Sequence, residues 1–138
     1  MQKKINFIDL GKHPITNNFL NLSKPKNEFF YNLKLIFHSE TKLVSLAKFV
    51  SPKKMFNEKY AHRASASKTM QVAYTKLAKL IKKEYKPKSI LEIGSNDGVF
   101  IKHFKDINNL GVEPCKNLAL ITKKMGIKTY DDFCTYEL

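Results

Sequence analysis

Residues 89–100 read SILEIGSNDGVF, and this stretch decides the fold. It opens as a short apolar run that only Glu92 interrupts, which is typical of a buried strand in a parallel sheet. The run breaks at Gly94, turns as far as Gly98, and then resumes as an apolar segment typical of the start of a helix. Because glycine has no Cβ, the backbone can take a positive φ there and a ligand can approach closely. The stretch therefore predicts a strand, a glycine turn and a helix that together bind a nucleotide-like ligand.

A second short apolar strand, Leu-Gly-Val-Glu-Pro at residues 110–114, ends in an acid. Glu113 follows the first turn by about twenty residues, where a dinucleotide-type fold places the carboxylate that accepts hydrogen bonds from a ribose. The two glycines of the turn do not form the GxGxxG pattern that cradles a pyrophosphate, and this favours a smaller adenosine ligand. The alternative is that Glu113 is a strand-end acid exposed to water.

Two short segments accompany this turn, Gly-Val-Glu-Pro at residues 111–114 and Asn-Leu-Ala at residues 117–119. Together with residues 90–98 they resemble the S-adenosylmethionine-dependent C-methyltransferases that act on nucleotide-linked deoxysugars. The resemblance extends upstream to residues 9–20, which contain Asp-Leu-Gly and Phe-Leu, and to residues 56–70. It thus covers most of the chain.

The resemblance implies an α/β protein. It would contain part of the Rossmann-like parallel sheet of a class I methyltransferase, preceded by a small β-hairpin module and an amphipathic helix. We expect the β-containing N-terminal module at residues 1–60, a helical connector at residues 61–88, and the first half of the methyltransferase domain at residues 89–138.

The resemblance also implies the function, which is transfer of a methyl group from S-adenosylmethionine to a carbon atom of a nucleotide-linked sugar. Glu113 would hold the ribose of this cofactor, and the turn would line its methionine end. The expected cofactor-binding residues are Glu92, Gly94, Ser95, Asn96, Gly98 and Glu113. The helical connector would bring Tyr60, Arg63 and Ser65 near the methyl donor or the sugar.

In this family the N-terminal module usually carries paired cysteines that bind a structural zinc ion. This chain has two cysteines, Cys115 and Cys134, and neither lies in the module. His38 stands at the turn where one cysteine pair would be, and a tetrahedral zinc site needs four sulfur or nitrogen ligands. We therefore expect no metal site and a module held together by apolar contacts.

From Ser89 to Leu138 the sequence supplies three strands and two helices at most. A parallel sheet needs helices on both faces, and a class I methyltransferase has seven strands. No residue here can be assigned as the general base, so we do not expect catalysis by this chain alone. A second polypeptide that completes the fold is a predicted partner. The alternative is a non-catalytic binding or interaction module that keeps the half-fold.

The net charge is +13, from 25 basic and 12 acidic residues, and the excess lies in residues 1–88. A basic surface can attract anions such as nucleic acid or a sugar diphosphate. However, all the basic residues except Arg63 are lysines, scattered singly or in pairs. Nucleic-acid interfaces depend on arginine for bidentate contacts, and this composition therefore argues against a nucleic-acid partner.

No apolar run is long enough to span a bilayer, and the first residues show no apolar signal segment. Two cysteines are too few for a disulfide framework and fit a reducing compartment. The sequence therefore predicts a cytoplasmic protein without a membrane partner.

The periodicity of the remaining segments predicts their secondary structure. Expected elements are an irregular, partly extended segment at 5–22, a hairpin of strands at 29–37 and 43–47, a helix at 67–85, a helix at 117–124, and a third parallel strand at 127–130. The helix at 67–85 would be capped by Ser65 or Ser67, end at Pro87, and bury an apolar stripe in the core. Asp131 to Phe133 would either bracket the adenine, as in methyltransferases of this fold, or form an acidic surface turn.

Overall fold

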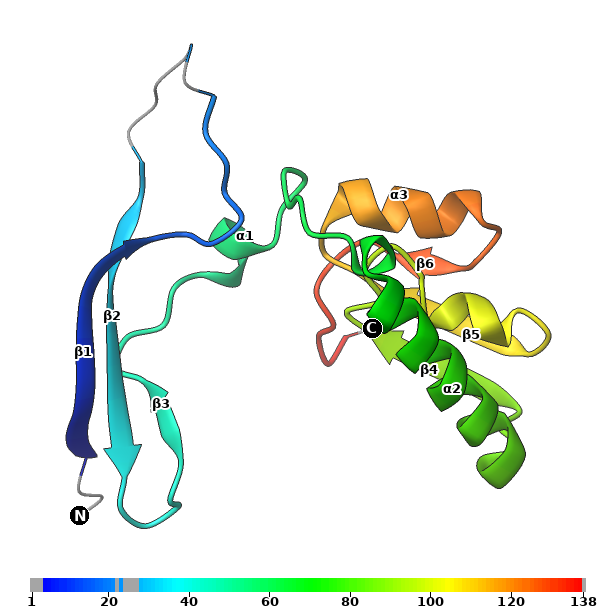
Figure 1. Ribbon diagram of the computed structural model, residues 1–138, viewed down its shortest axis with the longest axis horizontal. Coiled ribbons are helices and arrows are strands. Elements are labelled where there is room, and N and C mark those ends of the chain that lie inside the picture. The colour runs from blue at the N-terminus through cyan, green and yellow to red at the C-terminus, as the bar shows by residue number, and fades with distance from the viewer. Residues whose placement is uncertain (1–3, 22, 24–27, 138) are drawn as a thin grey trace. The chain divides into compact units, whose positions relative to one another are not determined.

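The chain forms two compact units, Met1–Met55 and Phe56–Leu138 (Figure 1). The computed structural model describes residues 4–21, 23 and 28–137. It shows an α/β protein with one antiparallel and one parallel three-stranded sheet. The two units are described separately below.

The first unit is an antiparallel sheet of strands β1 (Lys4–Pro14), β2 (Phe30–His38) and β3 (Val44–Leu46), followed by the short helix α1 (Pro52–Met55). The strand order is β1-β2-β3. This confirms the predicted hairpin, because β2 and β3 pair across the turn that follows His38.

Residues 5–22 were predicted to be irregular and partly extended, and their first half is extended but forms a regular strand. Residues 4–14 form β1, which pairs with β2. The pairing register is interrupted twice, between Asn6 and Ile8 and between Asp9 and Lys12. Gly11, with φ +79°, lies in the second interruption. Pairing with a distant strand, which no local pattern reports, fixes this conformation. Residues 15–21 have no regular secondary structure.

Burial in the first unit is shallow. Among its described residues, Ile15 is the one buried apolar side chain. The predicted buried face of β2, consisting of Tyr31, Leu33, Leu35 and Phe37, is half-buried. Phe7 and Leu10 of β1 are exposed. The described residues of this unit provide no helical layer across the sheet, so much of its apolar surface is left unpacked within the unit.

The second unit has a parallel sheet of β4 (Ser89–Ile93), β5 (Asn108–Val112) and β6 (Thr129–Tyr130), in that order. Its helical elements are η1 (Ala64–Ala66), α2 (Lys68–Tyr85), η2 (Ile101–Phe104) and α3 (Lys116–Lys124). The predicted strands and long helices are thus confirmed to within a few residues. The helix predicted after the glycine turn is shorter than expected, because η2 is a four-residue 3-10 segment.

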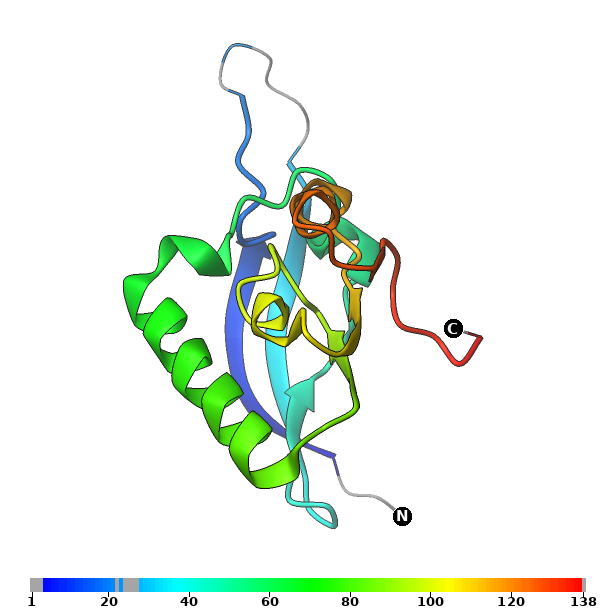
Figure 2. The same ribbon diagram turned by 90° about the vertical axis from the view of Figure 1, so that its right-hand side faces the viewer.

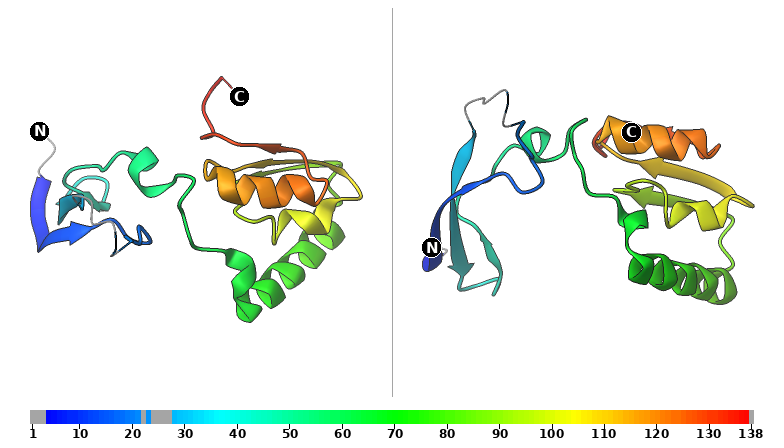
Figure 3. Two further views of the ribbon diagram at one scale, coloured as in Figure 1. Left: turned by 90° about the horizontal axis from the view of Figure 1, so that it is seen from above. Right: turned by 45° about the horizontal axis from the view of Figure 1, so that its top comes forward.

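The helices of the second unit lie on one side of its strands, as Figure 2 and the left-hand view of Figure 3 show. Beneath them is a core that includes Ile101, Phe104 and Leu118, each fully buried. On the opposite face Leu91 and Ile93 remain 53% and 63% exposed. Within the described part of the second unit, that face carries apolar side chains without a covering layer, whereas parallel sheets are usually covered on both faces.

Helix α2 begins and ends as the sequence predicts. The Ser67 side chain accepts a hydrogen bond from the Met70 N–H at 3.2 Å, which caps the first turn. Lys86 takes the left-handed conformation just before Pro87 and closes the last turn. No helix in the described part of the chain is long and apolar enough to cross a membrane.

The prediction that α2 buries its apolar stripe was wrong in most positions. Ala78 is the buried residue of this helix, and Leu77 and Leu80 are 43% and 53% exposed. The part of the predicted stripe that packs includes Tyr74, whose ring centroid lies 5.3 Å from that of Phe100. A small residue, Ala78, allows this close approach, and periodicity alone does not report which side of a wide stripe packs.

Candidate functional site

A pocket of about 340 Å³ opens at the carboxyl ends of β4 and β5. In open α/β sheets, ligands bind in this position, outside the carboxyl ends of the strands. The pocket walls combine apolar and aromatic side chains with a few polar groups, as small-molecule sites do. The lining residues are Phe56, Tyr60, Ile93, Gly94, Asn96, Val112, Glu113, Pro114, Phe133 and Cys134.

The glycine turn lies against the end of β5. Gly94, Asn96 and Gly98 have φ values of +74°, +50° and +77°, so three residues of the turn are left-handed. Glycine takes this conformation without strain and asparagine tolerates it better than most residues. The N–H groups of Gly94 and Ser95 both donate to the Val112 carbonyl, at 2.8 and 3.1 Å. These bonds fix the turn at the mouth of the pocket.

Glu113 is the central polar group of the site. It is 4% exposed, so the alternative of a strand-end acid in contact with water was wrong. One carboxylate oxygen accepts from the Asn96 N–H and the other from the Cys115 N–H, both at 2.8 Å. Each carboxylate oxygen can accept a second hydrogen bond. Glu113 therefore joins the turn after β4 to the loop after β5 and retains acceptor capacity at the pocket.

The turn also holds the segment that precedes α2. The Asn96 side chain accepts from the Ala64 N–H at 2.9 Å and donates to the His62 carbonyl at 3.3 Å. Asp97, buried, accepts hydrogen bonds from both the N–H and the hydroxyl of Ser65. This network positions residues 62–65 against the turn.

Of the six predicted cofactor-binding residues, the structure brings Gly94, Asn96 and Glu113 together around the pocket. The other three, Glu92, Ser95 and Gly98, are not part of its lining. A Cβ on Gly98 would lie 3.0 Å from the side chains of Thr122 and Met125. Gly98 therefore allows α3 to pack closely against the turn.

Glu92 occupies the covered face of the sheet, beneath the turn. One of its oxygens is buried without a hydrogen-bond partner in the described structure. Desolvation raises the pKa of Glu92 to about 7, although a hydrogen bond from the Ile101 backbone opposes the rise and the charge of Glu113 adds to it. The carboxyl group is thus partly protonated near neutral pH.

Glu92 makes the stability of the fold depend on pH. Below the ordinary glutamate pKa the group is protonated in both states and contributes nothing. As the pH rises from about 4.5 to about 7, the unfolded chain loses the proton while the folded chain keeps it, and the free energy of unfolding falls. We expect Glu92→Gln to raise the free energy of unfolding by roughly 2 kcal/mol at pH 8, an amount discounted because the side chain is only partly shielded from water.

Urea unfolding between pH 4 and pH 8 measures this effect. Glu84→Gln, at an exposed position on α2, is the matched control and should leave the pH dependence as in the parent. If Glu92→Gln and the parent lose the same stability between pH 4 and pH 8, Glu92 is not the group responsible.

One aromatic side chain of the pocket wall, Phe56, was not predicted from the sequence. Phe56 and Tyr60 both line the pocket, and their rings contact each other at a tilt of 52° with centroids 5.5 Å apart. Tyr60 was expected near the site, whereas Phe56 entered only as part of the resembling segment. Neither belongs to a periodic element, so no pattern marks them.

Two alternative roles were predicted for the acidic segment after β6, and its residues differ in the role that they fit. Phe133 lines the pocket, as expected of an apolar residue that brackets a ligand. Asp131 instead pairs with Lys123 at 3.0 Å, and the hydrogen bond from that ammonium lowers the pKa of the Asp131 carboxyl. The acid therefore faces the surface of α3.

Residues 1–56 match the family model Methyltransf_13, described as "Putative zinc binding domain". This identifies the N-terminal region as one associated with methyltransferases. No protein with a curated description matches the chain.

The residues of this region do not fit a zinc site. Residues 1–56 contain no cysteine. Their histidines are engaged in the sheet, since His38 Nε2 lies 2.8 Å from the Ser45 hydroxyl and His13 Nε2 lies 2.9 Å from the Leu10 carbonyl. Within the described ranges, no three His, Cys, Asp or Glu side chains are grouped as a metal ion requires.

Proposed function

We propose that residues 56–137 bind S-adenosylmethionine in the pocket at the carboxyl ends of β4 and β5. The observation that carries this proposal is the position of Glu113, a buried carboxylate in the pocket wall beside Gly94 and Asn96 of the turn. A carboxylate at the end of the second parallel strand can accept hydrogen bonds from ribose hydroxyls. The apolar wall that includes Phe56 and Phe133 would contact the less polar parts of the same ligand.

We further propose that the reaction is C-methylation of a nucleotide-linked sugar. Support comes from the methyltransferase-associated N-terminal region and from the resemblance of residues 90–98 and 111–119 to sugar C-methyltransferases. The bound cofactor would supply an electrophilic methyl group, and the contribution of this chain is to hold and align it. No residue around the pocket is assigned as a general base.

The uncovered face of the parallel sheet favours a second polypeptide in the working protein. Leu91 and Ile93 are large, apolar and exposed on that face, and such surfaces mark interaction sites. The same observation supports the alternative function, a non-catalytic module that pairs with another subunit. Binding of the methyl donor distinguishes the two, because the alternative requires none.

The test is calorimetric titration of the chain with S-adenosylhomocysteine, comparing Gly94→Ala with Gly126→Ala. Both glycines have positive φ, +74° and +78°, and a Cβ at either position would meet no atom within 4 Å. The backbone strain of the two variants is therefore similar, about 1 kcal/mol each. Gly94 lines the pocket and Gly126 does not, so we expect at least about tenfold weaker binding for Gly94→Ala alone, or about 1.4 kcal/mol.

Equal S-adenosylhomocysteine affinities for the parent and both variants would mean that the pocket is not the binding site. Absence of saturable binding by the parent chain, with its circular dichroism intact, would contradict donor binding by these residues and favour the non-catalytic alternative.

A further inference from the structure

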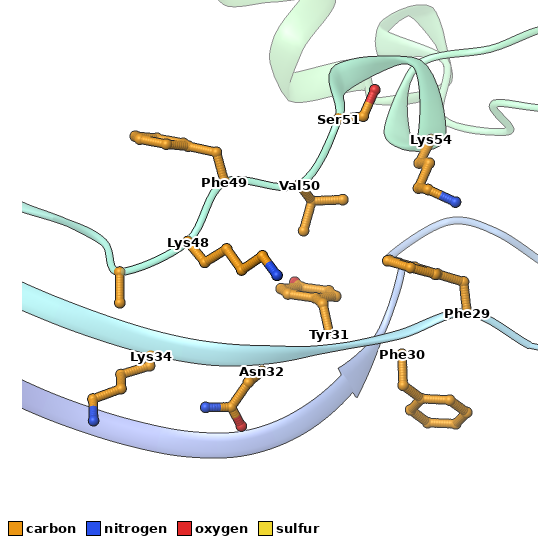
Figure 4. Close-up of a pocket in the computed structure, with 11 residues that line it drawn as sticks. Phe29, Phe30, Tyr31, Asn32, Lys34, Lys48, Phe49, Val50, Ser51 and Lys54 are labelled. Atoms are coloured by element: carbon orange, nitrogen blue, oxygen red, sulfur yellow. The ribbon is translucent and has the colours of Figure 1, made fainter.

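A hollow in the first unit is partly filled by side chains of the chain itself. It has a volume of about 620 Å³ and lies between β2 and the segment that runs from Ala47 into α1 (Figure 4). Lys54 Nζ lies 4.1 Å from the centre of the Phe29 ring, and Lys48 extends across the hollow toward Tyr31. The chain's own lysines therefore compete with any ligand for these aromatic faces.

Helix α2 carries a different kind of hollow on its outward side. The left-hand view of Figure 3 shows α2 as the outermost layer of the second unit, with η2 between it and the strands. Ala78, the buried residue of α2, faces inward. On the opposite side of the helix, a shallow hollow of about 420 Å³ is lined by Lys68, Thr69, Val72, Ala73 and Lys76.

The spacing of this lining matches the shape of a helix partner. Residues 69, 72, 73 and 76 stand at positions i, i+3, i+4 and i+7. In paired helices, four residues of one helix form the hole into which a side chain of the facing helix inserts. Thr69 and Ala73 are small, so they leave the hollow open for such a side chain.

The same face continues along the helix. Exposed residues recur on it at intervals of four and three positions, which is the repeat of a helix–helix seam. The seam extends over about four turns of helix. Its members are Thr69, Ala73, Lys76, Leu80 and Lys83.

The charge of this face is basic. Lys82 pairs with Asp106 at 2.7 Å. Lys83 lies 3.4 Å from Glu84, the one acidic residue of the helix. Three exposed lysines of α2 make no ion pair within the described part of the chain, namely Lys68, Lys76 and Lys79. A partner that complements this face carries carboxylates opposite them.

Two other occupants fit the face less well. In a second copy of this chain, the lysines of one face would meet those of the other, and like charges brought together at an interface cost free energy. A membrane-bound helix places large apolar side chains in the middle of its buried face. Here the middle of the face carries Lys76 and the small residues Thr69 and Ala73.

We propose that the outward face of α2, from Thr69 to Lys83, binds an acidic amphipathic helix of another polypeptide. An apolar side chain of that helix would enter the hollow, and its carboxylates would lie against Lys76 and Lys79. This surface is separate from the exposed sheet face of Leu91 and Ile93, which lies on the side of the strands away from the helices. The proposal does not depend on donor binding.

The test is calorimetric titration of the whole chain with a synthetic three-heptad peptide. The peptide has leucine at its a and d positions and glutamate at the flanking positions, where mutual repulsion opposes pairing of the peptide with itself. We expect saturable binding. Two control peptides should bind at least tenfold more weakly, one with lysine in place of each glutamate and one with the original composition in scrambled order.

Variants of the chain separate shape from charge. Ala73→Gln fills the hollow without a change of charge and keeps a good helix former, and it should weaken binding at least tenfold. Lys76→Glu/Lys79→Glu should weaken the glutamate peptide at least tenfold and strengthen the lysine peptide. The matched control, Lys124→Glu/Lys128→Glu, makes the same charge change at exposed positions of the second unit and should bind both peptides as the parent does. Circular dichroism verifies that each variant is folded.

Several results would overturn the proposal. One is no binding of the glutamate peptide by a folded parent chain. Equal binding of the scrambled peptide, or equal weakening by the two lysine double variants, would mean attraction by net charge alone. A dimer of the parent in sedimentation velocity that Ala73→Gln dissociates would identify a second copy as the occupant. Binding to phosphatidylglycerol vesicles that is tighter than binding to the peptide, and that Lys76→Glu/Lys79→Glu abolishes, would identify a membrane surface. Titration with S-adenosylhomocysteine reports separately on the donor site.

Discussion

Replacing Glu113 with alanine is expected to lower the free energy of unfolding of the second unit by roughly 2–4 kcal/mol. The carboxylate is buried and accepts one hydrogen bond from the Asn96 N–H and one from the Cys115 N–H. Its removal leaves two N–H groups in a protein interior without acceptors, and each such loss is costly. The same substitution removes the acceptor proposed for the ribose. We expect S-adenosylhomocysteine affinity to fall by roughly 1–3 kcal/mol.

Two measurements separate these effects. Urea unfolding gives the stability. Calorimetric titration at a temperature well below the thermal unfolding midpoint of the variant gives the affinity. Glu84→Ala, at an exposed position on α2, is the control for loss of an acid and should change neither quantity. Unchanged affinity in a folded Glu113→Ala protein would remove Glu113 from the donor site, and unchanged stability would mean that the two loop hydrogen bonds contribute little.

The sequence predicted the position of Glu113 but not its structural role. An acid at the end of a short apolar strand is a local signal, and so are the two glycines of the preceding turn. The hydrogen bonds that Glu113 accepts from Asn96 and Cys115 depend on two loops meeting at one sheet edge. The two loops lie together because β4 and β5 pair in parallel. A local sequence pattern indicates that pairing only indirectly.

The wrong predictions share a physical cause. Residues 5–22 were expected to be irregular and only partly extended because Gly11, Pro14 and the asparagines that follow interrupt them, yet pairing with β2 makes residues 4–14 a regular strand. Helix α2 was expected to bury its widest apolar stripe, yet contact with η2 buries a narrower face around Ala78. In both cases the deciding partner lies far away in the sequence. Tertiary contacts override a local preference of a few tenths of a kcal/mol per residue.

The second large effect is expected at Gly111, in the central strand of the parallel sheet. A Cβ added there would lie 2.8 Å from the Ser95 hydroxyl oxygen and 3.2 Å from the Ser95 Cβ. Neither the backbone at Gly111 nor the turn that carries Ser95 can move easily. Gly111 is held in register opposite Glu92 and Thr129 and donates to the Lys128 carbonyl at 2.9 Å, while the Ser95 N–H donates to the Val112 carbonyl at 3.1 Å. Gly111→Ala should therefore lower the free energy of unfolding by roughly 1–3 kcal/mol, the usual cost of overpacking a core.

A double-mutant cycle with Ser95→Ala tests the source of this loss. The Ser95 hydroxyl is buried and has no hydrogen-bond partner in the described structure, so Ser95→Ala alone should cost little. In the Gly111→Ala background it removes the 2.8 Å contact and should restore part of the lost stability, measured by urea unfolding. If the two substitutions are simply additive, the contact with Ser95 is not what makes glycine necessary. Recovery of stability together with S-adenosylhomocysteine binding would show that Gly111 acts by leaving room for the turn that carries Gly94 and Asn96 to the pocket.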